Sequence, residues 1–265
     1  MSPKKAIGAV QRIATTIMLP IVASCLSLGD AQWVDVFSGD DGGEAWTRQW
    51  FLEGDQASVV ATEAGIVFSA GPTVNDPSSH AVLWTQQSFS GDIRIEYDYT
   101  RLDSMTDETS VNILYIHATG IGESNSPTDI KESSHLRRIP FMRSYFLTMN
   151  LLHISYATTG PIRSHYVSAR QYPAHSVETF NESTLITPVY EDVRLFAPGH
   201  TYHITVTKLG NQLRLVAERG GRAKTFEWTI PDNPLIESGR IGFRHMWGRS
   251  SKYENIRIFA RSSST

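Results

Sequence analysis

The stretch from Tyr145 to Pro173 holds the densest set of side chains that could transfer protons or recognise a sugar. Its polar and aromatic members are Asn150, His153, Tyr156, Arg163, His165, Tyr166, Arg170 and Tyr172. Eliminative cleavage of a uronic acid chain needs a base, often Tyr or His, and a cation or amide that stabilises the charge developing beside the carboxylate. These residue types occur together here, and the predicted catalytic residues are His153, Tyr156, Arg170 and Asn150.

Strand periodicity restricts how these residues can be combined. Successive side chains of a strand point to opposite faces. In the segment Asn150–Tyr156, His153 and Ser155 therefore share one face, while Tyr156 lies on the other. One surface cannot hold the whole set unless a β-bulge shifts the register. A single histidine in a sheet is more often a hydrogen-bonded structural residue than a catalytic group, so the cluster carries more weight than any member.

Glycoside hydrolysis would need different residues, because it usually uses two carboxyl groups across the scissile bond. Glu96 and Asp98 share one face of a predicted strand, with Cα atoms ~7 Å apart, which suits an acid and a nucleophile. The same spacing suits a solvent-facing strand on which Arg94 pairs with Glu96, and we favour that interpretation. Glu53 is a further, isolated candidate.

Candidate binding residues lie near the ends of predicted strands, where loops often contact ligands. Aromatic rings suit sugars because the apolar face of a pyranose packs on them, and Trp50 and Trp247 could act in this way. Trp84 and Trp228 lie within predicted strands and are expected in the core. The candidates for substrate binding are Trp50, His117, Tyr172, Arg244, His245 and Trp247.

The sequence contains no strong signal for a metal or another cofactor. It has one cysteine, no His-x-His pair on a predicted core strand and no HExxH motif, so no transition-metal site is predicted. A structural calcium ion could bind at Asp40-Asp41, although an acidic turn is the simpler interpretation. The chain also lacks a Gly-rich phosphate loop and a Gly-x-Ser-x-Gly elbow, which argues against nucleotide and serine-hydrolase chemistry.

Many short strands must position these residues. Segments rich in β-branched and aromatic residues, each bounded by turn-forming residues, recur along the chain. The alternation is clearest in Asp92–Tyr99, where Ile93, Ile95, Tyr97 and Tyr99 share one face. Only Met142–Leu152 could hold a helix of one or two turns. Strands at this spacing predict an all-β chain that forms a single β-sandwich or jelly roll.

Two connections are too long to be tight turns. Gly120–Ser144 and Tyr172–Gly199 are both rich in polar and aromatic residues. Long loops in compact domains are often functional. We therefore predict that both loops form walls over one face of the sandwich.

Residues 1–31 are predicted to be an export signal. Three basic residues precede an apolar run that is too short and interrupted to span a bilayer comfortably. Two processing routes remain open: cleavage after Ala31, or lipid attachment at Cys25 within the lipobox-like Val22-Ala23-Ser24-Cys25. The domain, residues 32–265, is expected to act in the periplasm, outside the cell or lipid-anchored at the cell surface.

The charge of the chain does not favour an electrostatic partner. Apolar residues make up 40% of the chain and the formal net charge is -3, which excludes a mainly disordered chain. Loss of residues 1–31 would remove three basic residues and one acidic residue, leaving a charge of -5. We therefore expect a saccharide partner and no nucleic acid, with membrane contact only through a lipid anchor.

Several segments resemble a known family. They are Phe89–Ile93 with Glu96–Asp98, Asn150–Tyr156 with Arg170–Pro173, Gly239–Met246, and Tyr253–Ile258. Together they resemble the YesU-like family (domain of unknown function 1961) over roughly Trp46 to Phe259. The resemblance implies a concanavalin-A-like jelly roll of the lectin/glucanase superfamily and a link to polysaccharide breakdown. The positions it implies in a shared cleft are His80, Trp84, Asn150, His153, Tyr156, Arg170 and His245.

Two classes of function remain open. One is an exported polysaccharide-degrading enzyme, either a lyase or a glycoside hydrolase. The other is a non-catalytic carbohydrate-binding module or a lipid-anchored surface protein. We favour the enzyme because the titratable residues cluster and the two long loops could build a cleft.

Overall fold

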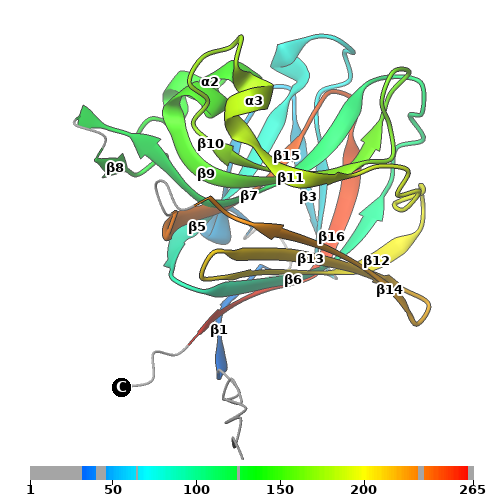
Figure 1. The fold of residues 1–265 in the computed structure, drawn as a ribbon. Helices are drawn as coiled ribbons and strands as arrows, with labels where there is room; N and C mark the ends of the chain where they lie inside the picture. The colour runs from blue at the N-terminus through cyan, green and yellow to red at the C-terminus, as the bar shows by residue number, and fades with distance from the viewer. Residues whose placement is uncertain (1–31, 40–45, 64, 124–125, 232–235, 262–265) are drawn as a thin grey trace, which may run out of the picture. The chain divides into compact units, whose positions relative to one another are not determined.

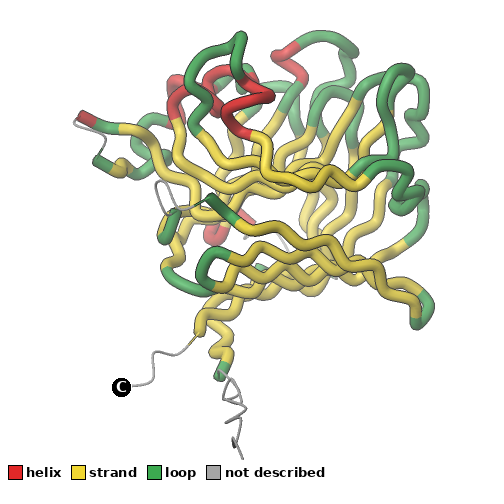
Figure 2. Tube along the Cα trace, in the orientation of Figure 1, coloured by secondary structure: helices red, strands yellow, loops and turns green. Residues whose placement is uncertain are grey.

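The computed structural model describes residues 32–39, 46–63, 65–123, 126–231 and 236–261. They all belong to one compact unit, residues 32–265. The predicted export signal with Cys25 lies outside the described residues, as do Asp40 and Asp41. Two eight-stranded antiparallel sheets pack against each other (Figures 1 and 2). This architecture confirms the predicted all-β sandwich.

The strands of sheet A, in spatial order, are β14 (Arg222–Thr229), β13 (Gln212–Arg219), β12 (Thr201–Leu209), β6 (Ile93–Arg101), β16 (Ser250–Arg261), β4 (Gly65–Ser69) and β3 (Ser58–Thr62), and β1 (Trp33–Ser38) pairs with β16. Strands β6, β12, β13 and β14 of sheet A lie in the lower part of Figure 1.

Sheet B forms the second layer. Its strands, in spatial order, are β11 (Leu185–Tyr190), β10 (Val167–Tyr172), β9 (Met149–Thr159), β7 (Ser110–Ile121), β15 (Ser238–His245), β5 (Ala81–Ser90) and β2 (Trp50–Glu53), and β8 (Pro127–Thr128) pairs with β7. The short helical segments are α1 (Trp46–Gln49), η1 (Pro77–Ser79), η3 (Ser134–Arg137), α2 (Met142–Thr148) and α3 (Phe180–Thr184).

The main core fills the space between the sheets because alternate side chains of each strand point inward. In β6 the predicted inward set is buried: Ile93, Ile95, Tyr97 and Tyr99. Sheet B contributes Leu114, Ile116, Leu152, Ile154 and Phe243 to the same cluster. Burial of this much apolar surface, at roughly 25 cal/mol per Å², holds the two sheets together.

The opposite face of β6 carries the two carboxylates considered for hydrolysis. Glu96 Oε1 lies 2.8 Å from Arg94 Nε, and Asp98 Oδ1 lies 2.8 Å from His203 Nδ1. Both pairs are partly exposed on the outer face of sheet A. The expected Arg94–Glu96 pair is confirmed, and these carboxylates lie on the other sheet from the His153 cluster.

A second apolar cluster covers the outer face of sheet B, the face directed away from sheet A. It joins strand residues such as Trp84 and Tyr115 to Ile130, Tyr145 and Phe146 of the covering segment. Helices α2 and α3 lie on this side of the sheet (Figure 1). The expected helical turn within Met142–Leu152 is therefore α2, and it is part of the cover.

The two long connections differ from each other. Gly120–Ser144 contributes η3 and the start of α2 to the cover of sheet B, as expected. Tyr172–Gly199 is not one loop, because it contains α3 and strand β11. Its Phe180 packs on Phe146 over sheet B at a ring distance of 4.5 Å, whereas Phe196 enters the core between the sheets. Only the first part of this segment therefore lies over the predicted face.

Candidate functional site

Strand pairing places residues of six strands, many of them polar or aromatic, in two neighbouring rows across the outer face of sheet B. One row, in register, is Phe51, Trp84, Gly242, Tyr115, His153 and Arg170. The next row is Glu53, Val82, Arg244, Ile113, Ser155 and Ser168. Residues far apart in the sequence thus become neighbours, and we call these two rows the outer-face cluster.

Three aromatic rings stack along this face. The rings of Trp84 and Tyr115 lie 5.4 Å apart at 16°, and those of Tyr115 and Tyr145 lie 5.9 Å apart at 14°. Gly242 makes this possible, since a Cβ there would lie 2.3 Å from the Trp84 ring. Trp84, expected in the core, is fully buried, but on the outer face rather than between the sheets.

Glu53 is buried at one edge of the cluster, and both of its carboxylate oxygens accept hydrogen bonds. It accepts hydrogen bonds from Trp84 Nε1 at 3.0 Å, from the Tyr145 hydroxyl at 2.6 Å and from Arg137 Nε at 2.8 Å. A buried carboxylate is stable only when it is paired and hydrogen-bonded in this way. Glu53 therefore anchors the covering segment to the sheet.

His153 forms the chemical centre of the cluster. Its Nδ1 lies 2.8 Å from the Tyr172 hydroxyl and its Nε2 lies 2.6 Å from Ser155 Oγ. Burial, followed by the charges of Arg170 and Arg244, lowers the pKa of His153 well below 6.5, so the ring is neutral. Burial raises the pKa of Tyr172 well above 10, so its hydroxyl keeps its proton.

Two arginines flank this pair. Arg170 is half-buried and donates to Thr184 Oγ1 at 2.9 Å and to Asn181 Oδ1 at 2.8 Å. Arg244 is fully buried, and its Nη2 lies 2.9 Å from His80 Nδ1. Trp247 is half-buried, and its ring lies 4.8 Å from the His80 ring. The predicted residues His80, Trp84, His153, Arg170, Tyr172, Arg244 and Trp247 thus lie on one side of sheet B.

The other predicted site residues do not reach this face. Tyr156 points into the core between the sheets, as strand periodicity indicated, and its oxygen accepts from the Tyr97 hydroxyl at 3.2 Å. Asn150 has the same parity as Tyr156 and pairs with Thr119 at the start of β9. Tyr156 and Asn150 therefore cannot act together with His153 in this fold.

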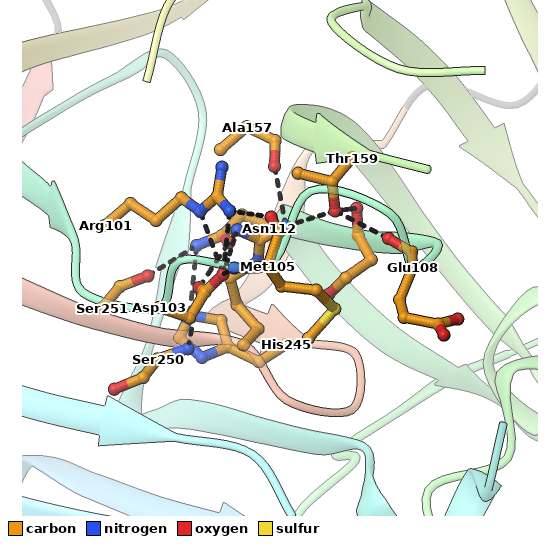
Figure 3. Close-up of polar contacts among 12 residues, drawn as sticks. Arg101, Asp103, Met105, Glu108, Asn112, Ala157, Thr159, His245, Ser250 and Ser251 are labelled. Atoms are coloured by element: carbon orange, nitrogen blue, oxygen red, sulfur yellow. Dashed lines mark hydrogen bonds and ion pairs between the residues drawn. The ribbon is translucent and has the colours of Figure 1, made fainter. Parts of the chain in front are cut away.

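Trp50, His245 and His117 also lie elsewhere. Trp50 is 1% exposed and packs in the main core, so the expectation that it stacks on a sugar is wrong. His245 is buried in the same core, stacked on Phe68 at 4.2 Å and 2.8 Å from the Tyr253 hydroxyl (Figure 3 includes His245). The physical reason is strand parity, since β15 directs Arg244 outward and His245 inward.

His117 sits at a β-bulge. Its φ is 54°, and the register between β7 and β9 shifts between Ile116 and Thr119. Its ring is buried, with Nδ1 3.5 Å from the Ile236 oxygen. The bulge removes His117 from the outer face, where unbroken alternation from Tyr115 would have placed it.

Sequence reasoning missed three residues as site candidates: Tyr115, which belongs to the cluster, and Tyr145 and Arg137, which contact it. Tyr115 shares its parity with Ile113, a signal present in the sequence, but its importance depends on β7 lying between β9 and β15. Arg137 and Tyr145 belong to the covering segment, and no local pattern predicted that they would converge on Glu53.

Hollows of ligand size lie around the covering segment and elsewhere in the sandwich. One, of about 560 Å³, is lined by residues of η3 and α2 and by Asp129, among others. A second, of about 340 Å³, reaches Glu53 at the edge of the cluster and is also lined by Asp55 and Arg138. A third, of about 410 Å³, is lined by Arg101 and Phe196, among others. Among the described residues, no group of three or more His, Cys, Asp or Glu side chains could hold a metal ion.

Comparison with solved structures defines the fold more closely. A protein of unknown function with a galectin-like fold from Bacillus subtilis matches with a TM-score of 0.63 and 17% identity, over 87% of this chain and 100% of that one. The chain folds as a lectin-like jelly roll. Basic winged bean lectin with Tn-antigen matches this lectin-like sandwich with a TM-score of 0.56 and 8% identity, over 88% of this chain and 100% of that one.

A legume lectin-like domain from Entamoeba histolytica also matches the sandwich, with a TM-score of 0.54 and 9% identity, over 88% of this chain and 100% of that domain. These likenesses confirm the concanavalin-A-like architecture implied by the sequence resemblance. No family model and no curated protein matches the chain, so membership of the YesU-like family stays a prediction.

Proposed function

We propose that this protein is carbohydrate-active and binds an oligosaccharide on the outer face of sheet B. The observation that carries the proposal is the outer-face cluster, which combines stacked aromatic rings with a histidine, a tyrosine and two arginines. Apolar rings with a few placed polar groups are the usual composition of a sugar site. The fold shared with a lectin whose structure contains Tn-antigen supports the same ligand class.

Binding on this face requires the cover to move. Tyr115, His153, Tyr172 and Arg244 are each at most 2% exposed beneath α2 and the segment before it. Trp247 and Arg170 are half-buried at opposite sides of the cluster. A saccharide would approach along these two side chains while the segment between η3 and α2 is displaced.

A second candidate function is eliminative cleavage of a uronic acid chain, and the His153–Tyr172 contact favours it. In this step the C5–H bond breaks, the Tyr172 oxygen takes that proton, and the hydroxyl proton of Tyr172 passes to His153 Nδ1. The electron pair forms the C4=C5 double bond, the C4–O bond breaks, and water protonates the leaving oxygen. A neutral His153 is the form that can accept this proton.

A polysaccharide panel tests both functions. Affinity gels detect binding, and reducing ends measured together with unsaturated-uronate absorbance detect cleavage. Tyr172→Phe and Tyr156→Phe remove the same atom from the outer face and from the core. We expect Tyr172→Phe to lower turnover about 100-fold or more and Tyr156→Phe to leave it unchanged. Binding without any product would support saccharide binding and refute cleavage. No binding to any saccharide would refute both functions.

We also propose that the protein acts outside the cytoplasm, on the evidence of residues 1–31. None of the helices within the described residues is long and apolar enough to cross a membrane. Mass spectrometry of the mature protein, together with a Cys25→Ala variant, tests the two processing routes. A lipid adduct lost in Cys25→Ala means an anchored protein, a free N-terminus at Gln32 means a secreted one, and an intact N-terminus in an exporting host contradicts export.

A further inference from the structure

Arg244 is a buried cation that lacks an ion-pair partner among the described residues. It is 0% exposed, and no carboxylate of the described residues forms an ion pair with it. Its Nη2 donates to His80 Nδ1 at 2.9 Å and to the Pro140 oxygen at 2.7 Å. Its Nε and Nη1 have no hydrogen-bond partner.

Other buried arginines of the sandwich are paired. Arg249, also 0% exposed, lies 3.1 Å from Asp103 Oδ2 and donates to the Ala157 oxygen at 2.9 Å. Figure 3 shows the dense polar contacts around Asp103. Arg137 pairs with Glu53 in the same manner. An unpaired buried charge is costly. Arg244 is an exception among these arginines, because its guanidinium contacts the Tyr145 ring at 4.4 Å and two neutral acceptors but no carboxylate of the described residues.

His80 adds a further donor at the same place. The Arg244 guanidinium can only donate, so His80 Nδ1 must accept from it. Burial and the charge of Arg244 lower the pKa of His80 to about 3, so the ring is neutral and carries its hydrogen on Nε2. His80 Nε2 has no partner, and neither does Nε1 of the adjacent Trp247. Two nitrogens of the Arg244 guanidinium, Nε and Nη1, and two neutral N–H groups therefore lie here without an acceptor.

We propose that Arg244 and His80 bind the carboxylate of an acidic sugar, so that the ligand of this face is an oligosaccharide containing uronic acid. This inference rests on the proposed saccharide binding and names its substrate class. A guanidinium forms strong charge-assisted hydrogen bonds to carboxylates, and the half-buried Trp247 ring is positioned to pack on the sugar. Entry displaces the segment around Pro140, whose neighbours Ile139 and Phe141 are exposed.

The binding experiment compares sugars that differ only in charge. Calorimetry is carried out on the full chain with oligogalacturonate, oligoglucuronate and oligomannuronate, each as the free acid and as its methyl ester. We expect at least one acid to bind about 10- to 100-fold more tightly than its ester. Arg244→Met removes this preference, and Arg244→Lys keeps the preference with weaker binding.

A stability measurement separates a ligand-binding arginine from a structural one. Arg244→Met removes a charge that has no carboxylate partner, together with the hydrogen bonds to His80 and Pro140, and we expect its Tm to fall less than that of a variant that breaks a buried ion pair. Arg249→Met is the matched control, because it removes one of the two arginine partners of Asp103, the other being Arg101, and we expect it to lower Tm. A loss of Tm in Arg244→Met as large as in Arg249→Met would make Arg244 structural and overturn the inference.

The binding outcomes distinguish this inference from the proposed function. Equal binding of acids and esters would overturn the carboxylate site while saccharide binding stands. If Arg244→Met still binds the acids more tightly than the esters, Arg244 is not the residue that binds the carboxylate. Failure to bind any saccharide would remove the proposed function itself.

Discussion

Acidification should destabilise this protein well above the pH at which carboxylates titrate. His80 and His117 are buried, and their pKa values are lowered to about 3 and about 4, in both cases first by burial and then by a nearby cation. His153 and His245 have pKa values lowered well below 6.5 for the same first reason. Below pH 6.5 the unfolded chain therefore binds protons that the folded chain cannot bind.

The sign and size of the effect follow from these shifts. A histidine with a lowered folded pKa costs no stability above pH 6.5, and stability is lost as pH falls from 6.5 toward the folded pKa. Between pH 7 and pH 5, His80 and His117 each remove about 2 kcal/mol, from 1.36 kcal/mol per pKa unit. His153 and His245 act in the same direction. The total loss is a large part of the free energy of unfolding of a typical domain, which is ~5–15 kcal/mol.

Urea unfolding at pH 7, 6 and 5, followed by tryptophan fluorescence, measures this loss. His117→Asn is the informative variant, since asparagine tolerates the positive φ at this position. We expect it to reduce the loss between pH 7 and pH 5 by about 2 kcal/mol. His200→Asn changes an exposed histidine and is the matched control.

The window from pH 7 to pH 5 isolates the histidines. The lowered pKa values of Asp76, Asp129 and Asp192 weaken the fold only near and below their usual value of 3.8. An unfolding free energy that stays constant from pH 7 to pH 5 would refute the reasoning. The reasoning is also refuted if the free energy of unfolding depends on pH equally in His117→Asn and in the parent, because His117 would then be protonated in the folded state.

Three further substitutions test other parts of the structure by urea unfolding. Glu53→Gln should cost about 3–5 kcal/mol because it leaves Arg137 buried without its charge partner, and a loss below 1 kcal/mol would mean that the cover is not anchored there. Tyr156→Phe should cost only ~1 kcal/mol, the worth of one buried hydrogen bond, and any accompanying loss of saccharide binding would contradict its placement in the core. Gly242→Ala should cost ~1–3 kcal/mol because its methyl group would meet the Trp84 ring at 2.3 Å, and unchanged stability would show that the ring can move aside freely.

The sequence predicted the features that depend on neighbours along one strand. The alternation of β6 placed Ile93 and Tyr97 inside and the Arg94–Glu96 pair outside, and the same rule separated His153 from Tyr156. Period two is a local property of an extended backbone, so no knowledge of the partner strands was needed. The fold class followed from the same short alternating segments and the turn residues between them.

The tertiary structure alone decided which residues meet on sheet B. Glu53, Tyr115, His153 and Arg244 come from four strands whose order is set by non-local packing between the two sheets. The bulge at His117 shows the limit of the local rule, since one extra residue redirects a side chain that alternation would place on the outer face. The sequence by itself therefore determined the strands, their inward faces and the all-β class. Strand order, register and the covering segment determined the candidate site, because these arise from contacts between residues far apart in the chain.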